Sequence, residues 1–230
     1  MAQVLLQRRD LEARGQVGFE FEKIVERICN LPWEHLSEDD VLRVAFVYYY
    51  FSVQFRENLE IATQLYPADE QLKKLWSEEC QTSNLSPWDG IARENEKMNH
   101  DEFVRRVLAL EPARDAADLE LAGRRYLDFV RRIDKRARAK SIASFEDGGL
   151  FKVFCAMLRA RSWSGPGARA FRHFLEKHLE FDGAGDSSHG ALSRHLSADD
   201  SILPLWGAFE DILLSAIPAF ARRQAESPAR

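Results

Sequence analysis

The residues of this chain with the clearest chemical potential are histidines and acids on the apolar faces of predicted helices. In the segment ARAFRHFLEKHLEFD, helical spacing places His178 and Asp182 on one face with Phe171, Phe174 and Leu175. Burying an imidazole and a carboxylate without partners costs several kcal/mol. The two side chains must therefore bond to each other, to another helix or to a metal ion. For this pair alone, a mutual hydrogen bond is the simpler explanation.

A second inward acid, Glu146, favours the metal. It shares an apolar stripe with Val153 in the segment SIASFEDGGLFKVFCAML. If the helices before and after the turn at 162–167 form an antiparallel hairpin, residues equidistant from that turn lie at the same level. Glu146 is then level with His178 and Asp182, so that three metal-competent side chains converge inside a helical bundle.

Two further histidines extend the set. His100 begins an apolar stripe in the segment EKMNHDEFVRRVL, and Glu96 lies one helical turn before it on the same face, whereas Glu94 points elsewhere. His189 follows a glycine-containing break seven residues after Asp182. We therefore expect Glu96, His100 and His189 to complete the site. Either Asp182 or Asp186 could join His189, and we prefer Asp182.

Imidazole and carboxylate ligands in this number suit iron or manganese better than a thiolate-preferring metal, and they leave coordination positions open for oxygen. A redox function is the natural expectation. Ferritin-type sites use Glu-x-x-His pairs, and none of the six histidines has a glutamate three residues before it. His35, His173 and His195 lack a clear inward acid partner, and we interpret them as ordinary surface, core or capping residues.

With its late His178-x-x-x-Asp182 motif followed by His189, and with His100 and Glu146 before it, the chain resembles the haem-oxygenase-like di-iron oxidase and oxygenase superfamily, relatives of the TenA and PqqC folds. The resemblance spans residues 38–220 and implies a helical bundle with two Fe(II) ions, or a mixed Mn/Fe pair. It also implies dioxygen as co-substrate for oxidising a small molecule, often an amino-acid or fatty-acid derivative in natural-product biosynthesis. The spacing from Asp182 to His189 is longer than is usual in the family.

The family's early glutamate is not fixed by spacing, and Glu79, Glu94 and Glu96 compete for that role. Helix periodicity favours Glu96. We predict that one iron is held largely by Glu96, His100 and Glu146. The other iron is held largely by His178, Asp182 and His189. Arg56 and Glu57 interrupt a long apolar helix and are predicted to contact the substrate, although an Arg56–Glu60 surface pair explains the arginine equally well.

Two other functions remain open. A metal-independent enzyme of the same fold would use Cys155 as a nucleophile, with the histidines as acid-base groups. Cys155 has apolar neighbours and no adjacent base, which favours a buried packing role. A non-enzymatic helical binding module is the third hypothesis. Bound iron would favour the first function, and turnover without metal would favour the second.

The elements that must position these residues are all helices. Apolar residues recur at helical spacing, and no alternating run flanked by hairpin turns appears, so the fold class is all-α. Ser37 precedes a helix that ends near Tyr66, before Pro67, and whose middle is apolar on every side; it should be central. The other expected helices are 17–30, 68–80, 96–110, 114–139, 141–162, 167–182 and 198–222.

Composition bounds the remaining expectations. The 230 residues carry 45% hydrophobic residues and no linker-like segment, so we expect one domain over 1–230 with flexible tails at 1–15 and 223–230. A formal net charge of -5 and the interrupted basic stretch at 131–140 disfavour nucleic acid as a partner. The apolar run 44–53 is too short for a membrane span. Without a signal peptide, and with three scattered cysteines, we expect a cytoplasmic enzyme, with a homodimer as a further expectation.

Overall fold

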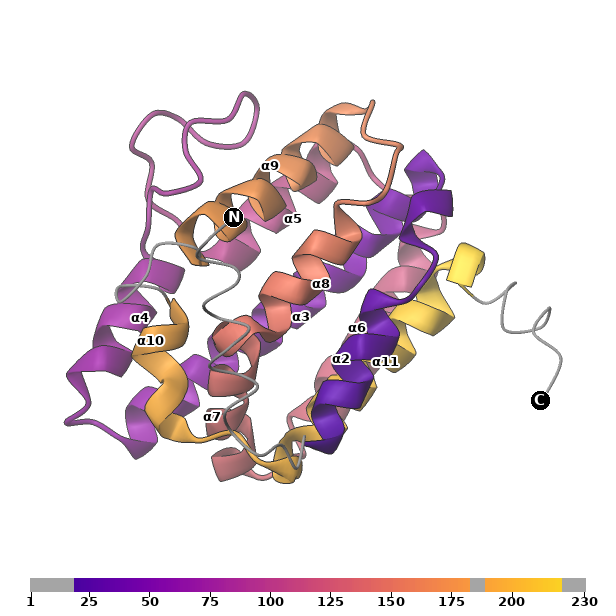
Figure 1. The fold of residues 1–230 in the computed structure, drawn as a ribbon. Coiled ribbons are helices and arrows are strands. Elements are labelled where there is room, and N and C mark those ends of the chain that lie inside the picture. The colour runs from indigo at the N-terminus through magenta and orange to yellow at the C-terminus, as the bar shows by residue number, and fades with distance from the viewer. Residues whose placement is uncertain (1–18, 183–188, 221–230) are drawn as a thin grey trace, which may run out of the picture.

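The chain folds into a bundle of helices in the computed structural model, which describes residues 19–182 and 189–220 (Figure 1). The side chains of Phe181 and Asp182 lie outside the described part, as do the tails expected to be flexible. Within the described ranges there is no β-strand, and only two isolated bridges, Thr82 with Met98 and Trp88 with Ala92, join extended segments. The all-α prediction is confirmed.

The helices follow one another along the chain with short connections, apart from a long segment between α4 and α5. In order they are α2 (Glu20–Cys29), α3 (Glu38–Leu65), α4 (Glu70–Cys80), α5 (His100–Leu110), α6 (Ala116–Val130), α7 (Lys135–Ser144), the π-helical turn η2 (Phe145–Gly149), α8 (Leu150–Met157), α9 (Pro166–Asp182), α10 (His189–Ser193) and α11 (Leu203–Ala216).

Helix α3 is the central element, as its sequence predicts. Ser37 caps its first turn by accepting a hydrogen bond from the Asp40 backbone amide, and the Asp40 carboxylate accepts one from the Ser37 amide in return. The helix is buried on all sides through its middle and packs against α4, α5, α6, α7, α9 and α11. It is the scaffold around which the other helices are arranged.

The structure corrects three expected helix boundaries. The helix expected over 96–110 begins only at His100, because residues 81–99 form an irregular segment. The helix expected over 114–139 is two helices, separated at 131–134, where Asp134 caps the start of α7. The helix expected from 141 is interrupted by η2, in which Asp147 and Gly148 leave helical geometry.

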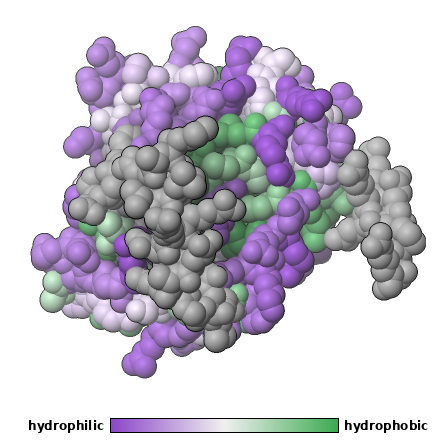
Figure 2. Space-filling model, in the orientation of Figure 1, coloured by the Kyte–Doolittle hydropathy of each residue, from purple (hydrophilic) through white to green (hydrophobic). Residues whose placement is uncertain are grey.

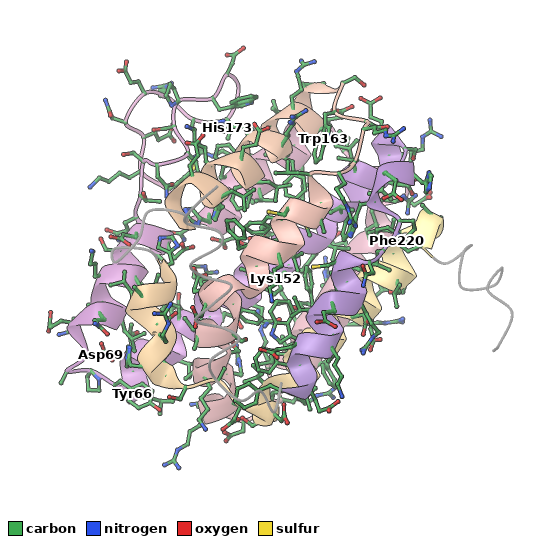
Figure 3. All side chains as sticks on the ribbon, viewed as in Figure 1. Tyr66, Asp69, Lys152, Trp163, His173 and Phe220 are labelled. Carbon is green, nitrogen blue, oxygen red and sulfur yellow. The ribbon has the colours of Figure 1, made fainter. Side chains whose placement is uncertain are left out.

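Side chains fill the space between the helices (Figure 3), and aromatic residues dominate the core around α3. Phe51 packs against Phe145 and Phe209, and Trp206 packs against Phe145. The described surface is mostly hydrophilic, with a hydrophobic hollow near the middle of the face shown in Figure 2. Among the described helices, none has both the length and the apolar character needed to cross a bilayer.

Candidate metal centre

Five side chains capable of binding a metal meet in the interior at one end of the bundle. They form two groups, and within each group the potential ligand atoms lie within 4.8 Å of one another. The first group contains Glu79, His100 and His178, and the second contains Glu79, Glu146 and His189. All five side chains are between 5% and 7% exposed. Glu79 belongs to both groups.

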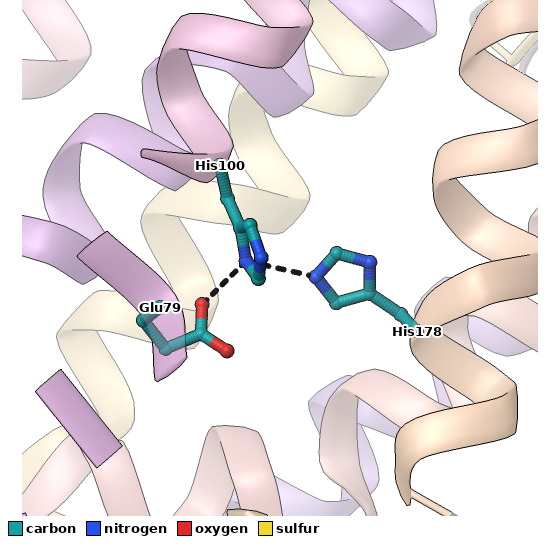
Figure 4. Close-up of side chains that lie close together, drawn as sticks. All are labelled: Glu79, His100 and His178. Carbon is teal, nitrogen blue, oxygen red and sulfur yellow. Dashed lines mark hydrogen bonds and ion pairs between the residues drawn. The ribbon is translucent and has the colours of Figure 1, made fainter. Parts of the chain in front are cut away.

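The two oxygens of Glu79 face different groups. Its Oε2 lies 2.6 Å from Nδ1 of His100, whose Nδ1 is in turn 3.1 Å from Nε2 of His178 (Figure 4). Its Oε1 lies 3.0 Å from Nδ1 of His189, which is 3.2 Å from Oε2 of Glu146. A carboxylate with this orientation can bind one cation through each oxygen and so join two metal ions.

The ring nitrogens that face away from the cluster have partners of their own. His178 places Nδ1 2.8 Å from the carbonyl oxygen of Phe174, and His100 places Nε2 3.3 Å from Oδ1 of Asn84. Both partners are acceptors, so with a metal ion on the inner nitrogens the outer nitrogens would carry the protons. Metal-binding histidines commonly donate their second N–H in this way, because the bond fixes the ring and turns the lone pair of the other nitrogen inward.

This arrangement leaves two ring nitrogens facing each other with no hydrogen atom between them, and a cation there would bind both. If the outer nitrogens of His100 and His178 carry the protons, the inner nitrogens that face each other at 3.1 Å are both lone-pair acceptors. Two acceptors do not attract one another. Either a further proton or a metal ion must lie between them, and the nearby Glu79 carboxylate favours either positive species.

The pKa shifts of the cluster show how its charges balance in the metal-free protein. Burial alone would raise the pKa of Glu79, but His100 and then His189 outweigh it and hold the pKa well below its usual value. Burial raises the pKa of Glu146, and His189 opposes this only in part. Burial would lower the pKa of His189, yet attraction chiefly to Glu79 raises it to about 12. A proton on His189 therefore balances the anionic Glu79.

His178 behaves differently from His189. Burial lowers its pKa to about 3, and the neighbouring His100 adds to the effect. At neutral pH its imidazole is uncharged, so its Nε2 lone pair is available without loss of a proton. Phe174 and Phe154 pack against the ring, with centroid distances of 4.2 and 5.5 Å. These rings keep water away from this side of the cluster.

Glu146 is placed by the π-helical turn η2. Such turns insert an extra residue into a helix and are frequent at functional sites. Gly148 adopts φ 92°, which glycine tolerates far better than other residues. Helix α10 packs against this turn, and a Cβ on Gly190 would lie 2.9 Å from the carbonyl oxygen of Glu146. The absence of a side chain at Gly190 therefore allows His189 to reach Glu146.

Four of the six predicted ligands are brought together, although His178 joins His100 and Glu146 joins His189, the reverse of the predicted grouping. Glu96 is not among them. It lies near the surface, where Oε1 is 2.7 Å from Nη1 of Arg106 and Oε2 accepts a hydrogen bond from the Arg93 amide. Its predicted position one turn before His100 is wrong because residues before Asn99 are not helical. Glu79, weighed as an alternative, stands beside His100 instead.

The signal for Glu79 is present in the sequence. It is buried on α4 with Leu72 and Leu75, which precede it by seven and four residues and form the apolar face of that helix. Glu79 is thus an acid on an apolar stripe, like Glu146. The interpretation that missed it extended a helix backwards from His100 across the irregular segment.

The two residues predicted to contact substrate are bound to other side chains. Arg56 is 3.1 Å from Asp101 and 2.8 Å from Glu60, which agrees with the alternative of a surface pair. Glu57 pairs with Arg131, which follows the end of α6, and with Arg138 on α7. Neither belongs to the two ligand groups.

Asp182 and Cys155 complete the comparison with the predicted residues. Asp182 ends α9, one turn after His178, but its side chain lies outside the described residues, so its role as a ligand stays a prediction. Cys155 is exposed on α8 rather than buried. Partial burial raises the pKa of its thiol, which disfavours the thiolate that a nucleophile requires.

Comparison of the chain with protein-family models, curated proteins and solved structures gives no match. What can be inferred about its chemistry therefore rests on the residues of the cluster themselves.

Proposed function

We propose that this chain is a non-haem di-iron oxidase or oxygenase, which uses dioxygen to oxidise a small molecule. One observation carries the proposal: the two oxygens of Glu79 face two separate sets of ligands, with 2.6 Å to His100 on one side and 3.0 Å to His189 on the other. A single metal ion would not need both sets. The resemblance to haem-oxygenase-like di-iron enzymes agrees with this arrangement.

The ligand atoms fit iron well. The cluster offers three imidazole nitrogens and two carboxylates and no thiolate, since the nearest cysteine in sequence, Cys80, is not among the ligands. Burial raises the pKa of the Cys80 thiol to about 12, so it stays protonated. Nitrogen and oxygen ligands of this kind suit iron and manganese, and a set of five for two ions leaves positions for oxygen. A mixed manganese-iron pair would fit the same ligands.

The protein's own contribution is to hold the metal ions, orient the side chains that bind them and keep water away from the site. When bound, ferrous iron supplies the electrons that reduce dioxygen. Glu79 would hold both ions through its two oxygens, and His178 offers a neutral nitrogen whose ring is held by the Phe174 carbonyl. Phe174 and Phe154 exclude water from the His178 side, which limits loss of oxidising equivalents to solvent. The substrate class suggested by the resemblance is an amino-acid-derived small molecule.

An anaerobic titration with Fe(II), followed by mixing with oxygen, tests the proposal. We expect about two ferrous ions per chain, because two ligand groups are present. Oxygen should then be consumed with a transient change in the visible absorption spectrum, and faster when the substrate is present. A stoichiometry near zero would reject the proposal. Turnover of a substrate by the metal-free protein would instead favour the metal-independent enzyme.

A further inference from the structure

Asn84, outside the helices, makes the only described side-chain contact to the outer nitrogen of His100. Its Oδ1 lies 3.3 Å from Nε2 of His100, while Nδ1 on the opposite side of the ring lies 2.6 Å from Glu79. The imidazole is thus held between a neutral amide outside the cluster and a carboxylate inside it. Sequence periodicity gave Asn84 no role, because it lies in the irregular segment 81–99.

We propose that Asn84 is a positioning residue of the metal centre: it accepts a hydrogen bond from Nε2–H of His100 and so keeps the lone pair of Nδ1 directed at the metal. The inference rests on the proposed function. Its physical basis is that a neutral imidazole carries one proton, and the nitrogen that donates a hydrogen bond cannot also bind a metal. Once Nδ1 binds a metal ion, the single ring proton is on Nε2, where the Asn84 oxygen at 3.3 Å accepts its hydrogen bond and holds the ring in that orientation.

The backbone fixes Asn84 from one side. Thr82 and Met98 form an antiparallel bridge, with amide-to-carbonyl distances of 3.3 and 3.0 Å, and Met98 stands two residues before His100. The amide of Asn84 also donates a hydrogen bond of 3.2 Å to Oγ1 of Thr82. The two ends of the segment 81–99 are thereby tied together at the level of His100, which places Asn84 beside the ring.

Helix α9 fixes the segment from the other side. Nε2 of His173 lies 3.1 Å from the carbonyl oxygen of the buried Leu85, and the His173 ring stacks on Trp88 with a centroid distance of 4.5 Å. Figure 3 labels His173 on α9 next to this segment. His173, expected to be an ordinary residue, thus anchors the stretch that carries Asn84, on the same helix as the ligand His178.

An asparagine suits this position better than an acid. The cluster already contains the carboxylates of Glu79 and Glu146, both buried. An amide oxygen accepts the hydrogen bond of His100 without adding a further negative charge to the interior. The equivalent acceptor for His178 is the Phe174 carbonyl, which no substitution can remove. Among the two histidines of the first group, only His100 depends on a replaceable side chain.

The experiment compares metal binding by variants of the full-length protein, with cobalt(II) as the probe because its visible spectrum reports the ligands. Asn84→Leu removes the acceptor at similar size, and Asn84→Asp keeps it. Glu94→Gln, an exposed change in the same segment, serves as the matched control. We expect Asn84→Leu to weaken the binding of one of two cobalt ions by about 10- to 100-fold and to alter its spectrum. Asn84→Asp, which keeps the acceptor although it adds a charge, should retain both ions and the wild-type ligand spectrum, and Glu94→Gln should bind like the unmodified protein.

A second readout separates positioning from folding. In the zinc-loaded protein, nitrogen-15 NMR of the imidazole identifies which ring nitrogen of His100 bears the proton, and we expect Nε2 in the unmodified protein and in Asn84→Asp. Unchanged cobalt affinity in a folded Asn84→Leu, or zinc ligation by Nε2 of His100, would overturn the inference and leave the proposed function standing. If the unmodified protein takes up no metal, both the role of Asn84 and the proposed function are rejected. If Asn84→Leu does not fold, Asn84→Ala replaces it in the same comparison.

Discussion

Replacing Glu79 by glutamine is the sharpest perturbation of the proposed centre. The amide keeps the size of the side chain and removes the negative charge that both ligand groups share. Glu79 is 2.6 Å from His100 and 3.0 Å from His189, so the change affects both groups at once. We expect Glu79→Gln to lose both iron ions, whereas a change at a ligand of one group alone would affect one ion more than the other.

The expected magnitude follows from what Glu79 contacts. Loss of an outer partner of a metal-bound histidine typically weakens metal binding by about 10- to 100-fold, and a ligand shared by two ions should matter more than that. The metal-free protein should also lose about 3 to 5 kcal/mol of its free energy of unfolding if His189 stays charged, because a buried cation is left without its main counter-charge. Loss of the proton from His189 would reduce this cost.

Equilibrium unfolding in urea, with and without Fe(II) under anaerobic conditions, measures both effects. At free iron of 100 times the dissociation constant, each occupied site should stabilise the unmodified protein by about 2.7 kcal/mol. Iron should leave the unfolding midpoint of Glu79→Gln unchanged. The contrasting variant is Glu96→Gln, which breaks only a partly exposed pair with Arg106 and should bind iron normally. If Glu96→Gln loses iron and Glu79→Gln keeps both ions, the assignment of Glu79 is wrong.

Three further outcomes are expected. Gly190→Ala brings a Cβ to 2.9 Å from the Glu146 carbonyl oxygen. Urea unfolding should show a destabilisation of about 1 to 3 kcal/mol, and iron titration should show weaker binding of the ion in the second ligand group. Burial would lower the pKa of His189, but attraction to Glu79 and Glu146 raises it from 6.5 to about 12, so its proton stabilises the metal-free protein fully below 6.5 and less as the pH rises towards 12. Iron must displace that proton, so the measured affinity should rise about tenfold per pH unit near neutrality. Cys155→Ser changes an exposed side chain and should leave turnover intact, whereas an inactive variant would support a cysteine nucleophile.

The sequence predicts the scaffold because the scaffold depends on local rules. The cap at Ser37, the apolar middle of α3 and its end before Pro67 are local, and the structure agrees with all three. Periodicity also identifies His178 and Glu146 as inward residues, because each lies on a helix with apolar neighbours at regular spacing. The all-α class and the positions of these two residues could therefore be read without a structure.

The other three proposed ligands lie at the ends of regular helices. Glu79 lies in the last turn of α4, His100 is the first residue of α5, and His189 is the first residue of α10. Periodicity does not extend across a helix end, which is why the pairing of Glu96 with His100 failed. What joins these ends is non-local, namely the bridge between segments 81–84 and 98–100, and the contact of α10 with η2.

The positions of these residues within their helices show where the buried charges lie in the bundle. Of the five proposed ligands, only His178 lies in a regular α-helix before its last turn; the others lie in η2 or in the first or last turn of α4, α5 and α10. Helix ends leave backbone groups without partners inside the helix, whereas the middle of α3 is packed on every side. His178 is held within α9 by the Phe174 carbonyl, whereas the positions of the other four depend on contacts between elements, such as that of α10 with η2. The proposed centre thus depends on how helix ends meet, and not on the periodicity of any one helix.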